Sequence, residues 1–216
     1  MSVIIINPNS TSSMTDAMLT QARRAAPELT FEGWTSHDGP PAIQGAVDGE
    51  AARAPLLKLV EKASLQGADG IIIGCFDDTA LEEAARLADC PVIGIGQASY
   101  HYAALRSWRF SVVTTLSISM PIIQSNIERQ GLGHVLSKVR ASEVPVLELE
   151  KNTGLAGNLV AQEALVAERE DGISAIILGC AGMVEIADTV RRKLSVAVVD
   201  PVECAAQCLV WVTHEN

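Results

Sequence analysis

Two cysteines occupy matching positions in two similar segments of the chain. Residues 67–75 read Gly-Ala-Asp-Gly-Ile-Ile-Ile-Gly-Cys and residues 172–180 read Gly-Ile-Ser-Ala-Ile-Ile-Leu-Gly-Cys, so five of the nine positions are identical. Each segment has the short apolar run of a buried strand and ends in Gly-Cys. A single cysteine in such a place is usually a small buried side chain, but the repetition indicates that Cys75 and Cys180 act as a pair.

Two like acid–base groups on opposite sides of one carbon can invert its configuration. One group removes the proton from one face while the other delivers a proton to the opposite face, and the reverse reaction exchanges their roles. Because an ordinary cysteine has a pKa of about 8.5, a modest shift gives a thiolate base near neutral pH. We expect a helix to begin after each cysteine, where its N-terminus would stabilise the thiolate and its backbone N–H groups would bind an enolate oxygen.

Strands and helices alternate along both halves of the chain. In the first half we expect strands near residues 2–6, 29–34, 70–74 and 91–95, and helices up to Ala26 and over 49–66, 78–89 and 97–106. In the second half we expect strands near 110–115, 135–141, 173–178 and 196–199, an extended stretch over 144–149, and helices over 118–130, 154–170, 182–193 and from 202. Apolar strands separated by helices are typical of parallel sheets.

The sequence therefore predicts an α/β fold of two pseudo-symmetric domains, each a small open parallel sheet flanked by helices. We place the first domain at 1–100 and the second at 101–201, with the C-terminal helix 202–216 packing back on the first. Ligands of such sheets bind at the carboxyl ends of the strands, so we expect the active site in the cleft between the domains. The strand ends that carry polar or reactive side chains are those followed by Asn7 and Asn9, by Cys75, by Thr114 and Thr115, and by Cys180.

Composition excludes several classes of partner. The net charge of −10 and the scattered basic residues argue against nucleic acid. No stretch approaches the roughly 20 apolar residues of a membrane span, and the apolar run Val3–Ile6 is too short for a signal peptide, so we expect a cytoplasmic protein without membrane contact. The five cysteines should be free thiols in a reducing compartment. Cys204 and Cys208 have no further ligand nearby, so we expect no metal site.

Motifs along nearly the whole chain resemble the Asp/Glu/hydantoin racemase family, and within it the hydantoin and allantoin racemase branch. In chain order they are Ile6-Asn-Pro-Asn-Ser-Thr11 with Met14-Thr15, Gly74-Cys-Phe-Asp-Asp78, Pro91-Val-Ile-Gly-Ile95, Phe110-Ser-Val-Val-Thr-Thr-Leu116, Val139-Arg-Ala141, and Leu178-Gly-Cys-Ala-Gly-Met183 with Val199-Asp200. The resemblance implies an enzyme with a small-molecule substrate, no cofactor and a homo-oligomeric assembly. It also implies that Cys75 and Cys180 are catalytic. The positions that it implies for substrate binding are Asn9, Phe76, Asp77, Thr115, Ala181 and Gly182.

Two loops depart from the pattern of that branch. Where a Ser-Ile-Glu-like element is typical, this chain has Ala42-Ile43-Gln44, and where Gly-Asp-Pro-Gly is typical it has Asp77-Asp78-Thr79-Ala80. Asp77 and Asp78 would also suit the cap and first turn of the helix expected over 78–89. We expect both loops to lie at the pocket.

The resulting hypothesis is a cofactor-independent racemase that inverts a carbon next to a carbonyl, in a hydantoin-like cyclic ureide such as a 5-substituted hydantoin or allantoin. Three alternatives remain open within the same superfamily: an Asp/Glu-type amino-acid racemase, a maleate cis–trans isomerase, and a single-cysteine decarboxylase, which the retention of both cysteines disfavours. A fourth is a non-enzymatic two-lobed binding module.

Overall fold

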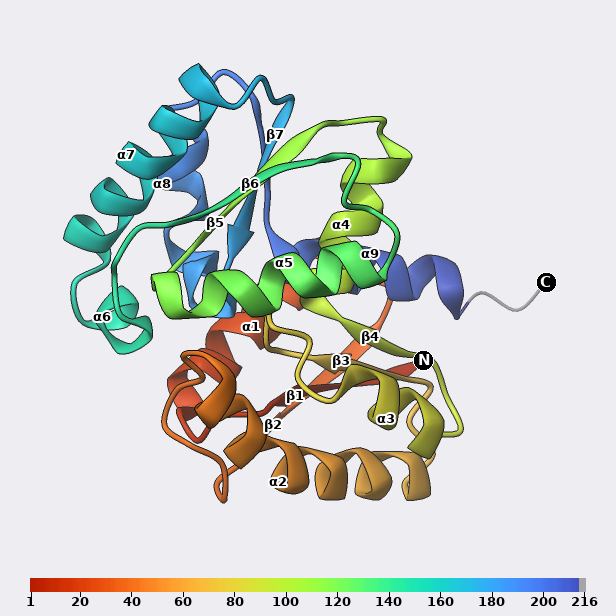
Figure 1. Ribbon diagram of the computed structural model, residues 1–216. Helices are drawn as coiled ribbons and strands as arrows, with labels where there is room; N and C mark the ends of the chain where they lie inside the picture. The colour runs from red at the N-terminus through yellow and green to blue at the C-terminus, as the bar shows by residue number, and fades with distance from the viewer. Residues whose placement is uncertain (214–216) are drawn as a thin grey trace.

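The computed structural model describes residues 1–213 as two lobes, each built on a parallel sheet of four strands (Figure 1). The first sheet has the order β2-β1-β3-β4 and the second the order β6-β5-β7-β8. The strands of the first are β1 (Ser2–Asn7), β2 (Thr30–Thr35), β3 (Gly70–Ile73) and β4 (Val92–Gly94). Those of the second are β5 (Phe110–Thr114), β6 (Leu136–Ala141), β7 (Ala175–Gly179) and β8 (Ala197–Val199). The α/β fold with two like halves is therefore confirmed.

The helices separate into those that cover the outer faces of the sheets and those that lie between the lobes. The outer helices are α2 (Ala46–Leu65) and α3 (Leu81–Leu87) on the first sheet, and α7 (Thr153–Glu170) and α8 (Ala187–Arg191) on the second. The inner ones are α1 (Ser12–Ala25), α4 (Ile95–Leu105), α5 (Met120–Arg129) and α9 (Pro201–Val212). The remaining elements are α6 (Val146–Lys151) and the 3₁₀ turns η1 (Ser117–Ser119) and η2 (Ala181–Glu185).

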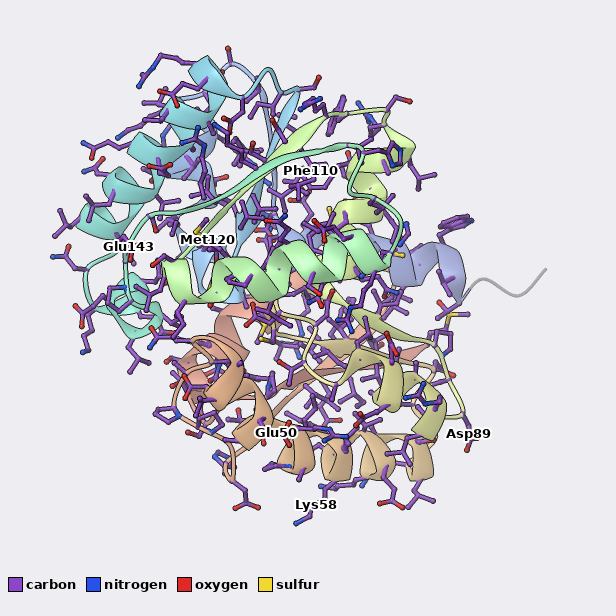
Figure 2. All side chains as sticks on the ribbon, viewed as in Figure 1. Glu50, Lys58, Asp89, Phe110, Met120 and Glu143 are labelled. Atoms are coloured by element: carbon purple, nitrogen blue, oxygen red, sulfur yellow. The ribbon has the colours of Figure 1, made fainter. Side chains whose placement is uncertain are left out.

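The central strands β1, β3, β5 and β7 bury both of their faces, as their unbroken apolar runs predict. In β1, Val3 and Ile5 join the core that the two lobes share, whereas Ile4 and Ile6 pack on the other face against α2. Phe110 of β5 points into the same shared core, while charged side chains such as Lys58 lie at the outer surface (Figure 2). One continuous core therefore holds the two sheets in a defined relation.

The repeated glycines have the same backbone role in both halves. Gly67 follows α2 with a φ of +74°, and Gly172 follows α7 with a φ of +61°. Glycine adopts this left-handed conformation without the steric penalty of a Cβ, and it commonly ends a helix. Each glycine turns the chain from its helix into the strand that ends at a cysteine, which explains why the sequence repeat begins there.

Three features of the chain differ from the sequence-based expectations. The stretch 144–149, expected to be extended, is largely the helix α6, because Val146 and Leu149 bury together at helical spacing and Pro145 suits a helix start. The helix expected over 182–193 is broken into η2 and α8. The helix expected over 78–89 begins only at Leu81.

The C-terminal helix contacts both halves of the chain. α9 packs against α1 and α4 and touches β3 and β4, and it also touches β7 and η2 of the second lobe. Residues 214–216 of the expected helix 202–216 lie outside the described residues. The domain division at residue 100 stays a prediction.

Over residues 1–213, no helix combines the length and the apolar character needed to cross a membrane.

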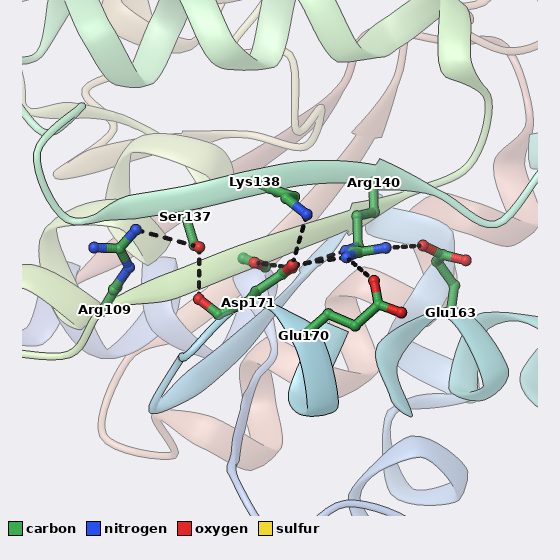
Figure 3. A network of polar contacts seen from close by, with 8 residues as sticks. Arg109, Ser137, Lys138, Arg140, Glu163, Glu170 and Asp171 are labelled. Carbon is green, nitrogen blue, oxygen red and sulfur yellow. Dashed lines mark hydrogen bonds and ion pairs between the residues drawn. The ribbon is translucent and has the colours of Figure 1, made fainter. Parts of the chain in front are cut away.

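A buried carboxylate, Asp171, ties α7 to the second sheet at the end remote from the cysteines (Figure 3). Arg140 of β6 donates to both of its oxygens at 2.7 Å, and Ser111 of β5 donates at 2.7 Å. The side chain of Asp171 is 0% exposed and that of Arg140 is 13% exposed. Burial alone would raise the pKa of Asp171, but the hydrogen bonds from Arg140, Ser111 and Lys138 outweigh it and hold the pKa at about 2.

We predict that Asp171→Asn lowers the free energy of unfolding by about 2–3 kcal/mol at neutral pH, because an unfolded Asp has a pKa of about 3.9. Because the pKa of Asp171 is lower in the folded state than in the unfolded state, the ionised carboxylate stabilises the native protein above about pH 4. This contribution is lost as the pH falls toward about 2. Urea unfolding of the wild type at neutral and acid pH should show this loss, and the variant should lack it. Lys138→Ala is the control, since its exposed pair should contribute less than about 1 kcal/mol. Equal stability of Asp171→Asn and wild type at neutral pH would contradict the account.

Candidate active site

A small cavity of about 30 Å³ lies where the carboxyl ends of the two sheets meet. It receives residues from both lobes, including those that follow β1, β3, β5 and β7. It is lined by all eight positions for which the resemblance implies catalysis or substrate binding, namely Asn9, Cys75, Phe76, Asp77, Thr115, Cys180, Ala181 and Gly182. Of the two loops expected at the pocket, Ile43 and Asp77 line it, whereas Ala42, Gln44, Asp78, Thr79 and Ala80 do not.

Seven further residues line the cavity, and the sequence identified them less well. Thr114 ends β5 beside Thr115, and Gly74 and Gly179 precede the cysteines, so their strand-end positions were a usable signal. Val146 was missed because its segment was expected to be extended, and no sequence signal marked Ser119. The full set is Met14, Ile43, Gly74, Thr114, Ser119, Val146 and Gly179.

Cys75 is separated from the end of β3 by Gly74 and lies at the start of a tight turn rather than at a helix. The hydroxyl of Thr79 donates to its sulfur at 3.5 Å, and the backbone N–H of Asp77 also hydrogen-bonds to it. Burial, reinforced by the charge of Asp77, raises the pKa of the Cys75 thiol above its usual range despite these donors. The expected helix N-terminus at Cys75 is therefore wrong, because α3 starts six residues later at Leu81.

Cys180 precedes the short 3₁₀ turn η2 and is in a similar environment. The backbone N–H of Gly182 hydrogen-bonds to its sulfur, as expected for the start of a helical turn. Burial nevertheless raises the pKa of the Cys180 thiol to about 12. For both thiols the expected lowering of the pKa by a helix N-terminus is wrong, since the loss of water outweighs the backbone donors.

Asp78 caps α4 instead of the helix that follows it in the chain. Its Oδ1 accepts the backbone N–H of Gly96 at 3.1 Å, and the backbone N–H of Gln97 also hydrogen-bonds to the carboxyl. Burial raises the pKa of Asp78 well above its usual range even so. Asp78 and Ala80 both have positive φ, +49° and +52°, so the turn after Cys75 is held in a strained conformation. The carboxyl of Asp78 is thus structural and belongs to the turn.

Asn9 is positioned by the asparagine that ends β1. Asn7 donates through Nδ2 to the Oδ1 of Asn9 at 3.0 Å and accepts the backbone N–H of Asn9 at 3.2 Å. Oδ1 of Asn9 also accepts the backbone N–H of Thr11 at 2.9 Å. Since Nδ2 of Asn9 reaches only the sulfur of Met14, at 3.6 Å, its amide can donate to a ligand in the cavity.

Contacts between the lobes close the cavity on the side of α6. The backbone N–H of Val146 donates to Oε1 of Gln44 at 2.9 Å, and Ser13 donates to Glu150 at 2.7 Å. Val146 also packs with Met14 and Ala42 of the first lobe. A cavity of about 30 Å³ holds one or two water molecules, which is less room than a ring-sized ligand needs.

The cavity between the cysteines carries negative rather than positive charge. Among its lining residues, all of which belong to the described part of the chain, there is no Lys, Arg or His, and Asp77 provides the carboxyl. Burial raises the pKa of Asp77 to about 7. The charge of Asp77 raises the pKa of both Cys75 and Cys180, so the three groups act on one another.

A larger cavity, of about 330 Å³, lies elsewhere, between α3, β4 and α5. It is lined by charged residues such as Glu82, Arg86 and Arg129 and contains neither Cys75 nor Cys180. We assign the candidate site to the smaller cavity, because only there do two acid–base groups from the two lobes converge.

Known proteins match this chain over nearly all of its length. The family model for Asp/Glu/hydantoin racemases matches residues 3–209. A hydantoin racemase from Rhizobium meliloti is 39% identical over 210 residues, which cover 96% of this chain and 86% of that protein.

Two solved structures also superpose closely. The allantoin racemase from Klebsiella pneumoniae has a TM-score of 0.92 at 35% identity, and the match covers 98% of this chain and 86% of that one. The allantoin racemase from Pseudomonas fluorescens has a TM-score of 0.93 at 31% identity, with 98% and 90% covered.

Proposed function

Because this chain belongs to the Asp/Glu/hydantoin racemase family and is a racemase, we propose that it inverts a carbon next to a carbonyl through Cys75 and Cys180, without a cofactor. The observation that carries the proposal is the convergence of both thiols, one from each lobe, on the same cavity. Their equivalent positions after β3 and β7 suit a reaction whose two directions exchange the roles of two bases.

In the proposed reaction, one cysteine acts as a thiolate and takes the proton from one face of the substrate. The carbon becomes planar as its charge moves onto the carbonyl oxygen, and the opposite thiol then delivers a proton to the other face. The backbone N–H groups of Asp77 and Gly182 lie at the sulfurs of Cys75 and Cys180, respectively, which suits the stabilisation of the enolate oxygen. Asn9, Thr115 and Gly182 complete the proposed substrate contacts.

We propose a neutral cyclic ureide, a 5-substituted hydantoin or allantoin, as the substrate. The carboxylates of aspartate, glutamate or maleate would find no cationic side chain among the described lining residues and would be repelled by Asp77. The hydantoin and allantoin racemases among the relatives point the same way. The amino-acid racemase and maleate isomerase alternatives are accordingly less well supported, and a non-enzymatic binding module has lost its basis.

We also propose that the protein works in the cytoplasm as a homo-oligomer. All five cysteines are free, as suits a reducing compartment. Trp211 and Val212 at the end of α9 are 72% and 45% exposed, and a second copy of the chain would cover them. Sedimentation equilibrium measures the assembly directly.

We predict that Cys75→Ser and Cys180→Ser each abolish racemisation, because a serine hydroxyl is too weak an acid to replace either thiol. Each variant should still exchange the reacting proton of one enantiomer with solvent deuterium, and the two variants should differ in which enantiomer they exchange. Nuclear magnetic resonance of single enantiomers in D₂O measures this exchange. Cys90→Ser is the matched control and should keep full activity, since Cys90 lies outside the cavity. Full racemisation by either cavity variant would end the two-base proposal.

For the substrate, we predict that single enantiomers of 5-substituted hydantoins or allantoin lose optical rotation in the presence of the protein, whereas aspartate and glutamate do not. Maleate should likewise give no fumarate. The reason is the absence of a cation to bind a carboxylate within the described lining of the cavity. Polarimetry without added cofactor, corrected for spontaneous racemisation, tests the ureides and amino acids. Faster turnover of glutamate or aspartate than of every ureide would refute the assignment.

A further inference from the structure

Asp77 carries the carboxyl group that reaches the cavity between the two cysteines. Burial raises its pKa to about 7, and within residues 1–213 no hydrogen bond or ion pair to this carboxyl lowers that pKa. Its charge in turn raises the pKa of Cys75, in its own lobe, and of Cys180, in the other. The carboxyl therefore lies within charge–charge range of both thiols and has no structural partner of its own.

In the cavity itself, the titratable groups beside Asp77 are the two thiols. The charge of Asp77 also raises the pKa of Asp78, which is committed to the backbone of α4, and of the fully buried phenol of Tyr100 on α4. Asp77 also lines a second pocket, together with Glu50 and Arg53 of α2 and Arg129 of α5. Arg53 is paired with Glu83 and Glu50, and Arg129 donates to Asn126, so both cations are engaged elsewhere.

We propose that Asp77 holds the negative charge of the resting cavity and takes the proton from whichever thiol serves as the base. This inference rests on the proposed two-cysteine mechanism and adds a third group to it. Three half-buried acids in one small cavity resist carrying more than one negative charge. A carboxyl is a much stronger acid than a thiol, so the resting site contains one carboxylate and two thiols.

Turnover then proceeds without a net gain or loss of protons. For the enantiomer that Cys75 attacks, the Asp77 carboxylate takes the proton of the Cys75 thiol, so an S–H bond breaks and an O–H bond forms. The Cys75 thiolate takes the substrate proton, and Cys180 gives its own proton to the opposite face and becomes a thiolate. Asp77 returns its proton to Cys180, which restores the carboxylate and two thiols. The other enantiomer follows the same steps with the cysteines exchanged.

Removal of Asp77 would change the rate in opposite directions, depending on whether Asp77 takes part in proton transfer or not. If Asp77 only repelled charge, its removal would lower the pKa of both thiols and speed the reaction. If Asp77 accepts the thiol proton, its removal leaves two buried thiols without a base and slows the reaction. The sign of the change in rate therefore separates the two roles.

The test is the pH dependence of kcat/KM for racemisation in Asp77→Asn, which keeps the size of the side chain and removes its charge. For the wild type we expect kcat/KM to rise through about pH 7, as Asp77 loses its proton, and then to level off. For Asp77→Asn we expect roughly a 10²–10³-fold loss near pH 7 and a continued rise above about pH 9. Asp77→Glu should restore part of the rate and the plateau. Asp16→Asn, an exposed aspartate on α1, is the control and should match the wild type.

Two results would each overturn the role of Asp77. One is an Asp77→Asn variant that is at least as active as the wild type near neutral pH. The other is a wild-type kcat/KM that does not rise with pH near about pH 7. The second measurement uses the unaltered protein, so the inference is tested even if the variant does not fold. Failure of the proposed two-cysteine mechanism can be told apart from failure of the role of Asp77. It would appear as racemisation by Cys75→Ser or Cys180→Ser, whatever the activity of Asp77→Asn.

Discussion

The proposed mechanism requires two thiols to reach one carbon from opposite sides, and the duplicated architecture suits this requirement. Cys75 and Cys180 follow equivalent strands in sheets of the same strand order. The shared core of α1, α4, α5 and α9 then sets how the carboxyl ends of those sheets face each other. A displacement of one lobe would separate the thiols, so the packing between the lobes is as much a part of the site as the cysteines.

Excluding water from the cavity has two opposed effects. It protects an enolate from the solvent and strengthens the hydrogen bonds of the backbone N–H groups near the sulfurs. It also raises the pKa of each thiol, which makes the thiolate harder to form. In our account Asp77 reconciles the two, because it stores the charge that the thiols cannot carry at rest. The hydrogen bond between Gln44 and Val146 joins the two lobes beside the same cavity.

Local patterns in the sequence predicted much of the fold and the site. The central strands were recognisable from unbroken apolar runs, and the strand-end positions of Cys75, Cys180 and Thr115 followed from them. Features that depend on distant contacts were not predictable. The helix α6 was hidden because Leu147 to Glu150 alternates apolar and polar residues. The direction of the thiol pKa shifts depends on burial that only the tertiary structure creates. The capping of α4 by Asp78, 18 residues away from Gly96, is likewise tertiary.

The central claim is that the proton removed and the proton delivered belong to different cysteines. The most direct measurement is a polarimetric time course in D₂O with a ureide that the protein racemises. It is started separately from each of the two protiated enantiomers. The account predicts that the product forms with deuterium while the remaining substrate keeps its hydrogen. Because the deuterated product reacts back more slowly, the rotation should pass through zero, overshoot to the opposite sign and then decay, as mirror images from the two enantiomers. A smooth decay to zero, with deuterium entering starting material and product equally fast, would contradict it.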